Sequence, residues 1–426
     1  MRRRFWGACL AAAILLLGMA PPIQSLGSLP STLYLLPGEP GTVSLPAGPL
    51  FQARVDQEEF LRLGDEPLST RWQPLREGEL WATAPGKARL EVAFLGLVPV
   101  ASLEVEARPA LYLSPGGEAL GVILRGTGVT VVDETALRGP DGVPRRPAFE
   151  AGIRPGDRLV AVEGVPVERK EDAAARIRSA IQKGDPVELE LERGGRTFRV
   201  QVPPVYDVRA QRYLIGLWIR DGASGVGTLT FVDPRTGTFA ALGHVVMDER
   251  TRQPFPTRDG AVVAALVTGV QKASAGSPGE KRAVFLPQEP LGYLTANTPL
   301  GIFGQWTGTW DQLAEPLPVA RPQEVEVGPA LLRTVLHGNQ VEEFQVVIER
   351  VQPQMAEGRG LVIRVTDPRL LEEAGGIVQG MSGSPIIQGG KLVGAVTHVF
   401  VHDPTRGYGT FAYWMAEAAG LFEEER

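Results

Sequence analysis

The chain has one cysteine in 426 residues, and this scarcity excludes several kinds of chemistry. Cys9 lies within the uncharged apolar run 5–20, which follows three arginines. The remainder of the chain has no thiol, so it cannot form disulfides, use a cysteine nucleophile or bind a metal through thiolates. A basic start before an apolar run is typical of an export signal, and about 16 residues are few for a membrane-spanning helix. We therefore expect residues 1–24 to be a signal or anchor segment of an exported protein, either membrane-tethered or secreted.

The chain also lacks a strong excess of one charge and has few long helical patterns. Its formal net charge is −6, and no long run of like charges occurs, so a nucleic-acid partner is not expected. Fifty-one glycines and 36 prolines interrupt most helical patterns. The frequent turns predict a mostly β protein, and in the second half of the chain a helix is expected only at 412–421.

Residues 25–109 contain short apolar stretches between glycines and prolines, such as 90–94 and 101–105. The alternation of apolar and polar residues in these stretches predicts a β-rich N-terminal domain. No pattern in this region is associated with catalysis, and its role stays open.

Residues 110–205 resemble a PDZ domain. The segment 148–159, AFEAGIRPGDRL, matches a turn and strand common in bacterial PDZ domains, and 170–182 is amphipathic with helical spacing. In this fold an extended peptide, either a C-terminus or an internal segment, adds as a strand beside the second strand. A PDZ fold that only packs against its neighbour is the alternative. The resemblance places the amides that hold the peptide carboxylate at Leu120, Gly121 and Val122.

The hexapeptide 380–385, GMSGSP, has the form of the nucleophile turn in trypsin-like serine proteases. One glycine stands two residues before Ser382, and another directly follows it. The backbone amides of Gly380 and Ser382 then form the oxyanion hole, where the charge of the tetrahedral intermediate develops. Residues 386–397 are predicted to form a strand, a Gly-Gly turn and a second strand, which is the hairpin that follows the nucleophile turn in trypsin-like proteases. The alternative interpretation of 380–385 is a structural Gly-Ser loop without a catalytic role. Residues 206–426 are therefore predicted to form a trypsin-like double β-barrel with Ser382 as nucleophile.

A serine nucleophile needs a base, and the sequence has four histidines. His244 follows an apolar strand and a glycine, which is how trypsin-like folds position the base. His398 falls where these enzymes place a residue beside the substrate cleft. It shares a predicted strand with His402, but no acidic or thiol ligand accompanies the pair, so no metal site is expected. His337 lies in a predicted surface turn.

The residues alone do not decide which carboxylate would orient the base. A trypsin-like topology places this residue in the first barrel, which favours Asp248 or Asp259. The full set of candidates is Asp248, Asp259, Asp311 and Asp367.

The chain also resembles the SpoIVB family, the stage IV sporulation protein B peptidases of endospore-forming bacteria. The motifs cover nearly the whole chain and include IGLWIRD at 215–221, PGEK at 278–281 and GGIVQGMSGSPII at 375–387. The resemblance implies His244 as base and Ser382 as nucleophile. No cofactor is expected. The third catalytic residue it implies, in a Thr-Asp-Pro sequence shortly before the serine, is Asp367.

For function, the resemblance implies a signalling protease in the space between the forespore and mother-cell membranes. It would cut a membrane-bound regulator of an intramembrane protease, so that a late mother-cell sigma factor is activated, and it would also cut itself. Two alternatives stay open. An HtrA-like quality-control protease usually carries its PDZ domain after the protease domain. A non-catalytic PDZ scaffold has no need of Ser382, His244 and Gly380.

Overall fold

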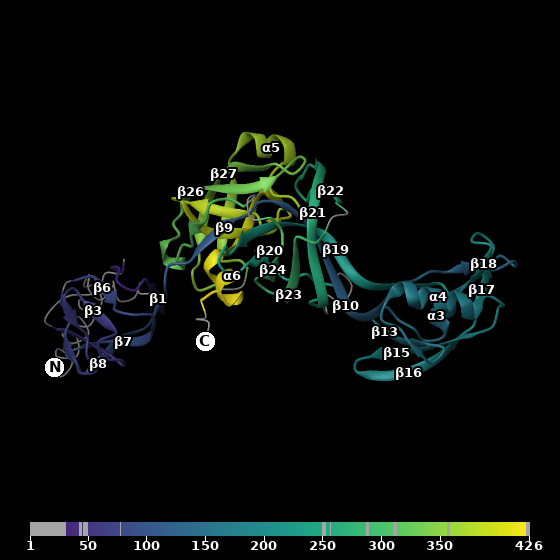
Figure 1. Ribbon diagram of the computed structural model, residues 1–426, viewed down its shortest axis with the longest axis horizontal. Helices are drawn as coiled ribbons and strands as arrows, with labels where there is room; N and C mark the ends of the chain where they lie inside the picture. The colour runs from purple at the N-terminus through teal and green to yellow at the C-terminus, as the bar shows by residue number, and fades with distance from the viewer. Residues whose placement is uncertain are drawn as a thin grey trace, which may run out of the picture. The chain divides into compact units, whose positions relative to one another are not determined.

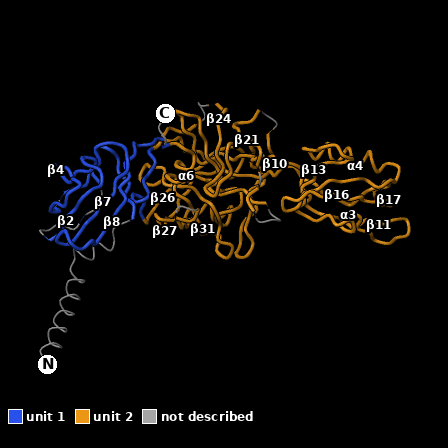
Figure 2. The backbone as a smooth tube through the Cα atoms, turned by 90° about the horizontal axis from the view of Figure 1, so that it is seen from below, with its two compact units in different colours: residues 1–112, 318–326, 422–426 blue, residues 113–317, 327–421 orange. Residues whose placement is uncertain are grey.

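The computed structural model describes residues 31–41, 45, 50–76, 78–248, 253–255, 257–286, 289–309, 313–355 and 358–422. The chain folds into two compact units, coloured separately in Figure 2. Unit 1 comprises Met1–Tyr112, Pro318–Glu326 and Phe422–Arg426, and unit 2 comprises Leu113–Leu317 and Val327–Leu421. The predicted signal or anchor segment, residues 1–24, and Asp311 lie outside the described residues. Among the helices that are described, none is both long and apolar enough to cross a membrane.

Unit 1 consists mainly of short strands in two sheets. Alternate residues of its strands are buried, as in β2, where Phe51, Ala53 and Val55 join the core beside Leu33 and Leu90. The five-stranded sheet has the order β1 (Thr32–Leu35), β8 (Val98–Ala107), β7 (Gly86–Phe94), β2 (Phe51–Val55) and β5 (Gln73–Pro74). The smaller sheet has the order β4 (Glu66–Pro67), β3 (Leu61–Leu63) and β6 (Leu80–Ala82), and the 3-10 helix η2 (Pro322–Glu324) completes the unit.

Unit 2 contains two six-stranded barrels, as a trypsin-like fold requires. The first barrel closes because β10 pairs with β21 on one side and with β19 on the other. Its core includes the buried side chains of Leu120, Leu229, Phe239 and Ile302. In order around the barrel, its strands are β10 (Ala119–Glu134), β21 (Thr257–Gln271), β23 (Gly292–Thr298), β24 (Gly301–Trp306), β20 (Thr238–Ala241) and β19 (Leu217–Val232). The same sheet also includes β9 (Tyr112–Pro115), β25 (Leu317–Pro318) and β22 (Glu280–Phe285).

The second barrel is closed by antiparallel pairs throughout. Its strands, in order, are β26 (Gly328–Val335), β27 (Val341–Val351), β28 (Leu361–Val365), β31 (Asp403–Phe411), β30 (Lys391–Phe400) and β29 (Pro385–Gln388). Helix α6 (Ala412–Ala418) lies where a helix was predicted, and its buried residues pack onto the barrel. Helix α5 (Pro368–Ala374), which follows β28, was not predicted from the sequence.

The PDZ fold shares its two longest strands with the first barrel (Figure 1). β10 and β19 pair antiparallel from Ala119–Thr228 in the barrel to Glu134–Leu217 in the PDZ sheet. Beside β10, the PDZ sheet continues through β13 (Arg158–Val162), β15 (Val187–Arg193) and β16 (Arg196–Val202), with β14 (Val165–Pro166) paired to β13. The remaining elements are β11 (Leu137–Arg138), β12 (Pro144–Arg145), α3 (Pro147–Glu150), α4 (Lys170–Ile181), β17 (Val205–Asp207) and β18 (Arg212–Leu214).

Candidate active site

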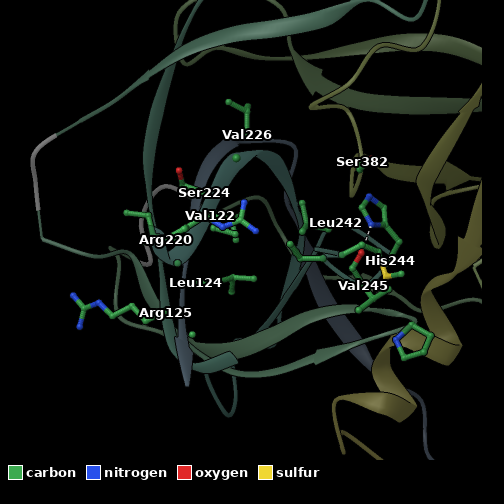
Figure 3. Close-up of a pocket in the computed structure, with 18 of the residues that line it drawn as sticks. Val122, Leu124, Arg125, Arg220, Ser224, Val226, Leu242, His244, Val245 and Ser382 are labelled. Atoms are coloured by element: carbon green, nitrogen blue, oxygen red, sulfur yellow. Dashed lines mark hydrogen bonds between the residues drawn. The ribbon is translucent and has the colours of Figure 1, made fainter. Parts of the chain in front are cut away.

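One cavity of unit 2 brings the predicted nucleophile and base together (Figure 3). Its volume is about 1740 Å³, and Ser382, His244, Gly380 and His398 all line it. His244 follows β20 of the first barrel, whereas Ser382 lies on the loop before β29 of the second. Trypsin-like proteases likewise combine a base from one barrel with a nucleophile from the other.

The turn that carries Ser382 depends on two glycines. Gly380 has φ 90° and Gly383 has φ 94°, in the left-handed region that residues with a Cβ rarely adopt. A Cβ on Gly383 would also collide with the carbonyl oxygen of Thr228. Thr228 fixes the turn to β19, because its amide donates to the Ser382 carbonyl (3.0 Å) and its hydroxyl donates to the Gly380 carbonyl (2.8 Å).

The two amides that the sequence assigns to the oxyanion hole have no acceptor within the described part of the chain. Their neighbours are satisfied, because the amide of Met381 donates to Val378 and that of Gly383 donates to Val396. The amides of Gly380 and Ser382 form no such bond. Unpaired backbone amides in a turn next to a serine are the donors that an oxyanion requires.

His244 is held by backbone geometry and not by a carboxylate. It follows Leu242 and Gly243, which have φ 70° and 68°, and a leucine in this region is strained. The Nδ1 atom of His244 lies 2.9 Å from the carbonyl oxygen of Val245, to which only an Nδ1–H can donate. The neutral ring then leaves Nε2 unprotonated, which is the tautomer that a general base needs. Burial lowers the pKa of His244 below its usual 6.5, so the neutral form persists into mildly acidic solution.

The hydroxyl of Ser382 does not bond to His244 in this arrangement. It donates instead to the carbonyl oxygen of Thr397, at 2.8 Å. Because a serine side chain changes rotamer readily, rotation about χ1 is the step that would turn the hydroxyl toward His244.

His398 lies beside the base, at the edge of the cleft, as the sequence suggested. Its ring centroid is 4.9 Å from that of His244, and the planes are tilted by 38°. Partial desolvation in the cleft, and then the charges of His244 and Arg359, lower the pKa of His398. His398 therefore stays neutral near neutral pH and adds no charge to the base.

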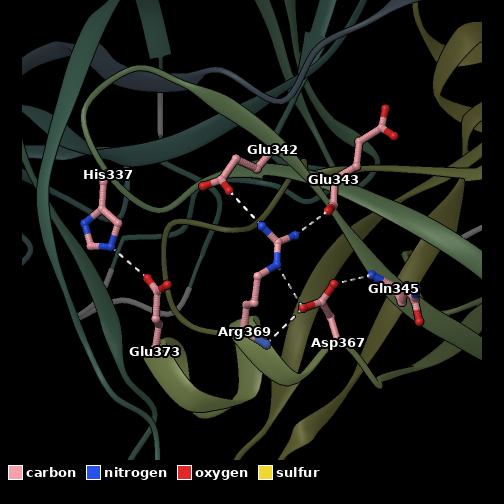
Figure 4. A network of polar contacts seen from close by, with 7 residues as sticks. All are labelled: His337, Glu342, Glu343, Gln345, Asp367, Arg369 and Glu373. Atoms are coloured by element: carbon pink, nitrogen blue, oxygen red, sulfur yellow. Dashed lines mark hydrogen bonds and ion pairs between the residues drawn. The ribbon is translucent and has the colours of Figure 1, made fainter.

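Asp367 bonds to backbone amides and not to His244, so the prediction that it orients the base is wrong for the structure described. Figure 4 shows the contacts of its carboxylate. Its carboxylate caps helix α5 by accepting from the amide of Arg369 (3.0 Å), and it also accepts from the amide of Gln345 (3.2 Å). Burial raises the pKa of Asp367, but these amides and the Arg369 charge outweigh that effect and lower it overall. Within the described residues, the His244 ring has one hydrogen-bonding partner, the Val245 carbonyl, and one ring contact, with His398.

The other candidate acids also have partners elsewhere. Asp248 forms an ion pair with Arg220 at 2.6 Å, and Asp259 pairs with Arg258 at 3.2 Å. His337 is exposed, as predicted, and pairs with Glu373. In the ranges that the structure describes, no cluster of three or more His, Cys, Asp or Glu residues could hold a metal ion.

Lys281, the last residue of the PGEK motif, is a buried amine for which no role was predicted from the sequence. Its side chain packs against the nucleophile turn, where a Cβ on Gly380 would lie 3.1 Å from the Lys281 Cβ. The amine donates to the Thr334 hydroxyl (2.7 Å), which also accepts from Ser384 (3.0 Å). Burial lowers the pKa of Lys281 to about 7, and among the described residues no carboxylate forms an ion pair with its amine, so the burial of this lysine is unusual.

The predicted peptide-binding amides of the PDZ domain lie inside the first barrel, so that prediction is wrong. Leu120, Gly121 and Val122 pair with β21 on one side and with β19 on the other, so their amides face other strands of the barrel. A Cβ on Gly121 would lie 2.7 Å from the ring of Phe285. No peptide can add to a strand whose two edges are both occupied.

The structure offers a different loop for the peptide carboxylate. Ile215 and Gly216 stand directly before β19, and their amides donate to no residue that the structure describes. The adjoining part of β19 contacts helix α4, which leaves a strand edge and a helix side by side. The signal in the sequence was the glycine at the start of the IGLWIRD motif, which precedes a strand as a carboxylate-binding loop does.

The double barrel, the serine turn and the PDZ fold define the class of the protein as a PDZ-containing serine peptidase. Comparison with known families identifies the kind of serine peptidase more closely. Residues 211–416 match the family described as SpoIVB peptidase S55, and residues 119–203 match a PDZ domain. The peptidase domain of this chain belongs to the SpoIVB peptidase family, as the sequence motifs implied.

Two curated relatives match shorter stretches. A protein of Bartonella henselae named as a zinc metalloprotease is 35% identical over 88 residues, which are 21% of this chain and 23% of that protein. A protein of Clostridium perfringens with a similar name is 35% identical over 75 residues, 18% of this chain and 22% of that protein. The chain thus matches less than a quarter of the length of these relatives.

The role of Asp367 can be tested with two substitutions. Asp367→Asn keeps an N-cap acceptor, whereas Asp367→Ala removes the cap at a cost of about 1 kcal/mol in the free energy of unfolding. We expect both folded variants to retain kcat, with only the alanine variant losing stability in urea denaturation. A loss of about 10⁴ in kcat for folded Asp367→Asn would show instead that this carboxylate reaches the base in the active state.

The pH dependence of activity should report the lowered pKa of His244. Because the neutral ring is the base, the acid limb of kcat/KM should have its midpoint below 6.5, and kcat/KM should drop about tenfold per pH unit below that midpoint. Hydrolysis of a short peptide ester gives this profile, and circular dichroism over the same range controls for unfolding. An acid limb with its midpoint above 6.5 would contradict the assignment.

The buried lysine should make stability depend on pH. The pKa of Lys281 is about 7 in the folded chain and 10.5 when exposed, so between these values only the unfolded chain binds the proton. The free energy of unfolding should therefore rise as the pH rises through this window. Lys281→Met should remove this slope and stabilise the protein at neutral pH by more than about 1 kcal/mol in urea denaturation. The exposed Lys272→Met is the control, and an unchanged slope in Lys281→Met would refute the explanation.

Proposed function

We propose that the protein is an exported serine endopeptidase that cuts a membrane-bound regulator during endospore formation. The observation that carries the catalytic part is the shared cavity of Ser382 and His244, next to the unpaired amides of Gly380 and Ser382. The signalling role, the space between the forespore and mother-cell membranes, and self-cleavage are proposed from the family resemblance. In this role the cut would release an intramembrane protease that activates a late mother-cell sigma factor.

The chemistry follows from the positions of these groups. After rotation of its side chain, the Ser382 hydroxyl attacks the scissile carbonyl carbon while Nε2 of His244 accepts its proton. The amides of Gly380 and Ser382 bind the oxyanion of the tetrahedral intermediate. His244 then gives the proton to the leaving amine as the carbon–nitrogen bond breaks, and water hydrolyses the ester in the reverse sequence. The Val245 carbonyl holds Nδ1–H throughout.

The PDZ fold supports a protein substrate and not a small ester. A substrate C-terminus or an internal peptide would add as a strand to the edge of β19 beside helix α4, with its carboxylate on the amides of Ile215 and Gly216. Such capture concentrates one partner near the cleft and gives narrow specificity. A quality-control protease of the HtrA kind would instead cut many unfolded chains, so digestion of casein at rates equal to those for a membrane regulator would favour that alternative.

A fluorophosphonate probe tests the catalytic proposal directly. The wild type should become labelled at Ser382, and Ser382→Ala should lose both labelling and peptide cleavage by at least about 10³-fold while keeping its thermal stability. The exposed Ser274→Ala serves as the matched control and should behave as wild type. Cleavage by Ser382→Ala at the wild-type rate would reject a serine mechanism, and a wild type that neither labels nor cuts would favour a PDZ scaffold.

A further inference from the structure

Strand β19 has one edge without a strand partner over most of its length. Between Leu217 and Gly227 its first edge pairs with β10. On its second edge β20 begins to pair only at Leu229, and no other strand occupies the stretch before it in the part of the chain that the structure describes. We call this second edge, from Leu217 to Gly227, the free edge of β19. Its residues are exposed or half-buried up to Val226.

The two ends of the free edge adjoin the two functional sites of unit 2. At the start lie the unpaired amides of Ile215 and Gly216, where a peptide carboxylate can bind. At the other end, Thr228 donates to the Ser382 carbonyl at 3.0 Å and holds the nucleophile turn. The distance between the sites along the chain is therefore fixed by a single continuous strand, whose hydrogen-bonded partner β10 keeps it extended.

The cavity that contains Ser382 and His244 follows the same strand (Figure 3). Seven consecutive residues of β19, Arg220–Val226, line it, and so do Glu168–Glu171 at the start of helix α4. Asp221 connects these two segments by accepting from the amide of Lys170, at 2.9 Å. One open space thus extends from the PDZ helix to the nucleophile.

The side chains along the free edge leave room for a second backbone. The stretch 222–227 reads GASGVG, with no side chain larger than valine. A Cβ on Gly225 would meet no atom within 4 Å, and its φ is not in the left-handed region, so neither packing nor backbone conformation demands a glycine there. A glycine within a strand is common where another backbone approaches closely.

We propose that the substrate binds as one extended strand along the whole free edge of β19, so that the PDZ domain sets the position of the cut. This inference rests on the proposed function. A substrate whose carboxylate lies at Ile215 and Gly216 must run antiparallel to β19, with its preceding residues alongside Leu217, Trp218 and onward. It therefore reaches Ser382 from the C-terminal side of the scissile bond.

The length of the free edge predicts the cutting distance. One substrate residue faces each residue of β19 in an antiparallel pair, so the stretch from Leu217 to Val226 accommodates about ten substrate residues. The scissile bond should then lie about ten to twelve residues before the captured C-terminus. A substrate segment shorter than this cannot reach from the carboxylate-binding amides to Ser382. A longer segment must bulge out of the strand.

The experiment digests a mixed library of peptides about 24 residues long with free C-termini, and maps each cut by mass spectrometry as its distance from the C-terminus. We expect a peak at about ten to twelve residues, which should disappear when the same library is amidated at the C-terminus. Cuts placed by local sequence alone, identical in both libraries, would overturn the inference and leave the serine peptidase intact. No cuts and no fluorophosphonate labelling would overturn the proposed function and the inference with it.

Two variants test the free edge itself. Gly225→Val adds a side chain in open space, so the fold should be unaffected, but the added methyl groups occupy part of the cavity that Gly225 lines and narrow the space for the substrate. With enzyme concentrations matched by active-site labelling, its kcat/KM for the free-carboxylate peptides should fall by at least about tenfold. Gly269→Val, at another strand glycine whose Cβ would meet nothing within 4 Å, is the control and should cut like wild type. Equal rates for both variants would show that no substrate strand passes Gly225.

Discussion

The pairing of β10 with β19 is the interaction on which the rest of unit 2 depends. It closes the first barrel between Ala119 and Thr228, and it continues into the PDZ sheet as far as Glu134 and Leu217. Each backbone hydrogen bond contributes only about 1 kcal/mol net, but an unpaired buried amide costs more, so the ladder forms as a whole. Because Thr228 of this strand also bonds to the nucleophile turn, the ladder connects the peptide-binding part of the chain to Ser382.

The features that the sequence predicted well are those set by local chemistry. An oxyanion hole demands glycine next to the nucleophile, so the GMSGSP turn could be recognised without any knowledge of distant partners. The base could also be predicted from local sequence, because His244 directly follows an apolar strand and a glycine. The β-rich fold followed from frequent turns and alternation. Helix α5 was missed because it is short, although an aspartate followed by proline is the start signal of a helix.

The predictions that were wrong depend on which residues contact one another across long stretches of the chain. Val262, one of the partners of Val122, lies 140 residues further along the chain, and an apolar strand looks the same in sequence whether it joins a PDZ sheet or a barrel. Asp367 precedes a proline, and the sequence cannot distinguish a carboxylate that caps a helix from one that orients a histidine. Lys281 stood within a recognised motif, but only its burial shows that the amine is unusual.

A base held by the Val245 carbonyl has consequences for how such an enzyme reaches a useful rate. The carbonyl fixes the tautomer, but it carries no full charge, so it stabilises the imidazolium of the transition state less than a carboxylate does; loss of the carboxylate typically costs a triad enzyme about 10⁴ in kcat. Binding energy from parts of the substrate remote from the scissile bond can offset such a deficit by fixing the reacting atoms in place. A long strand of substrate along β19 supplies binding of that kind. A weak catalytic centre together with an extended binding edge would leave most polypeptides uncut and favour the few that fill the whole edge, which is the selectivity that a signalling protease requires.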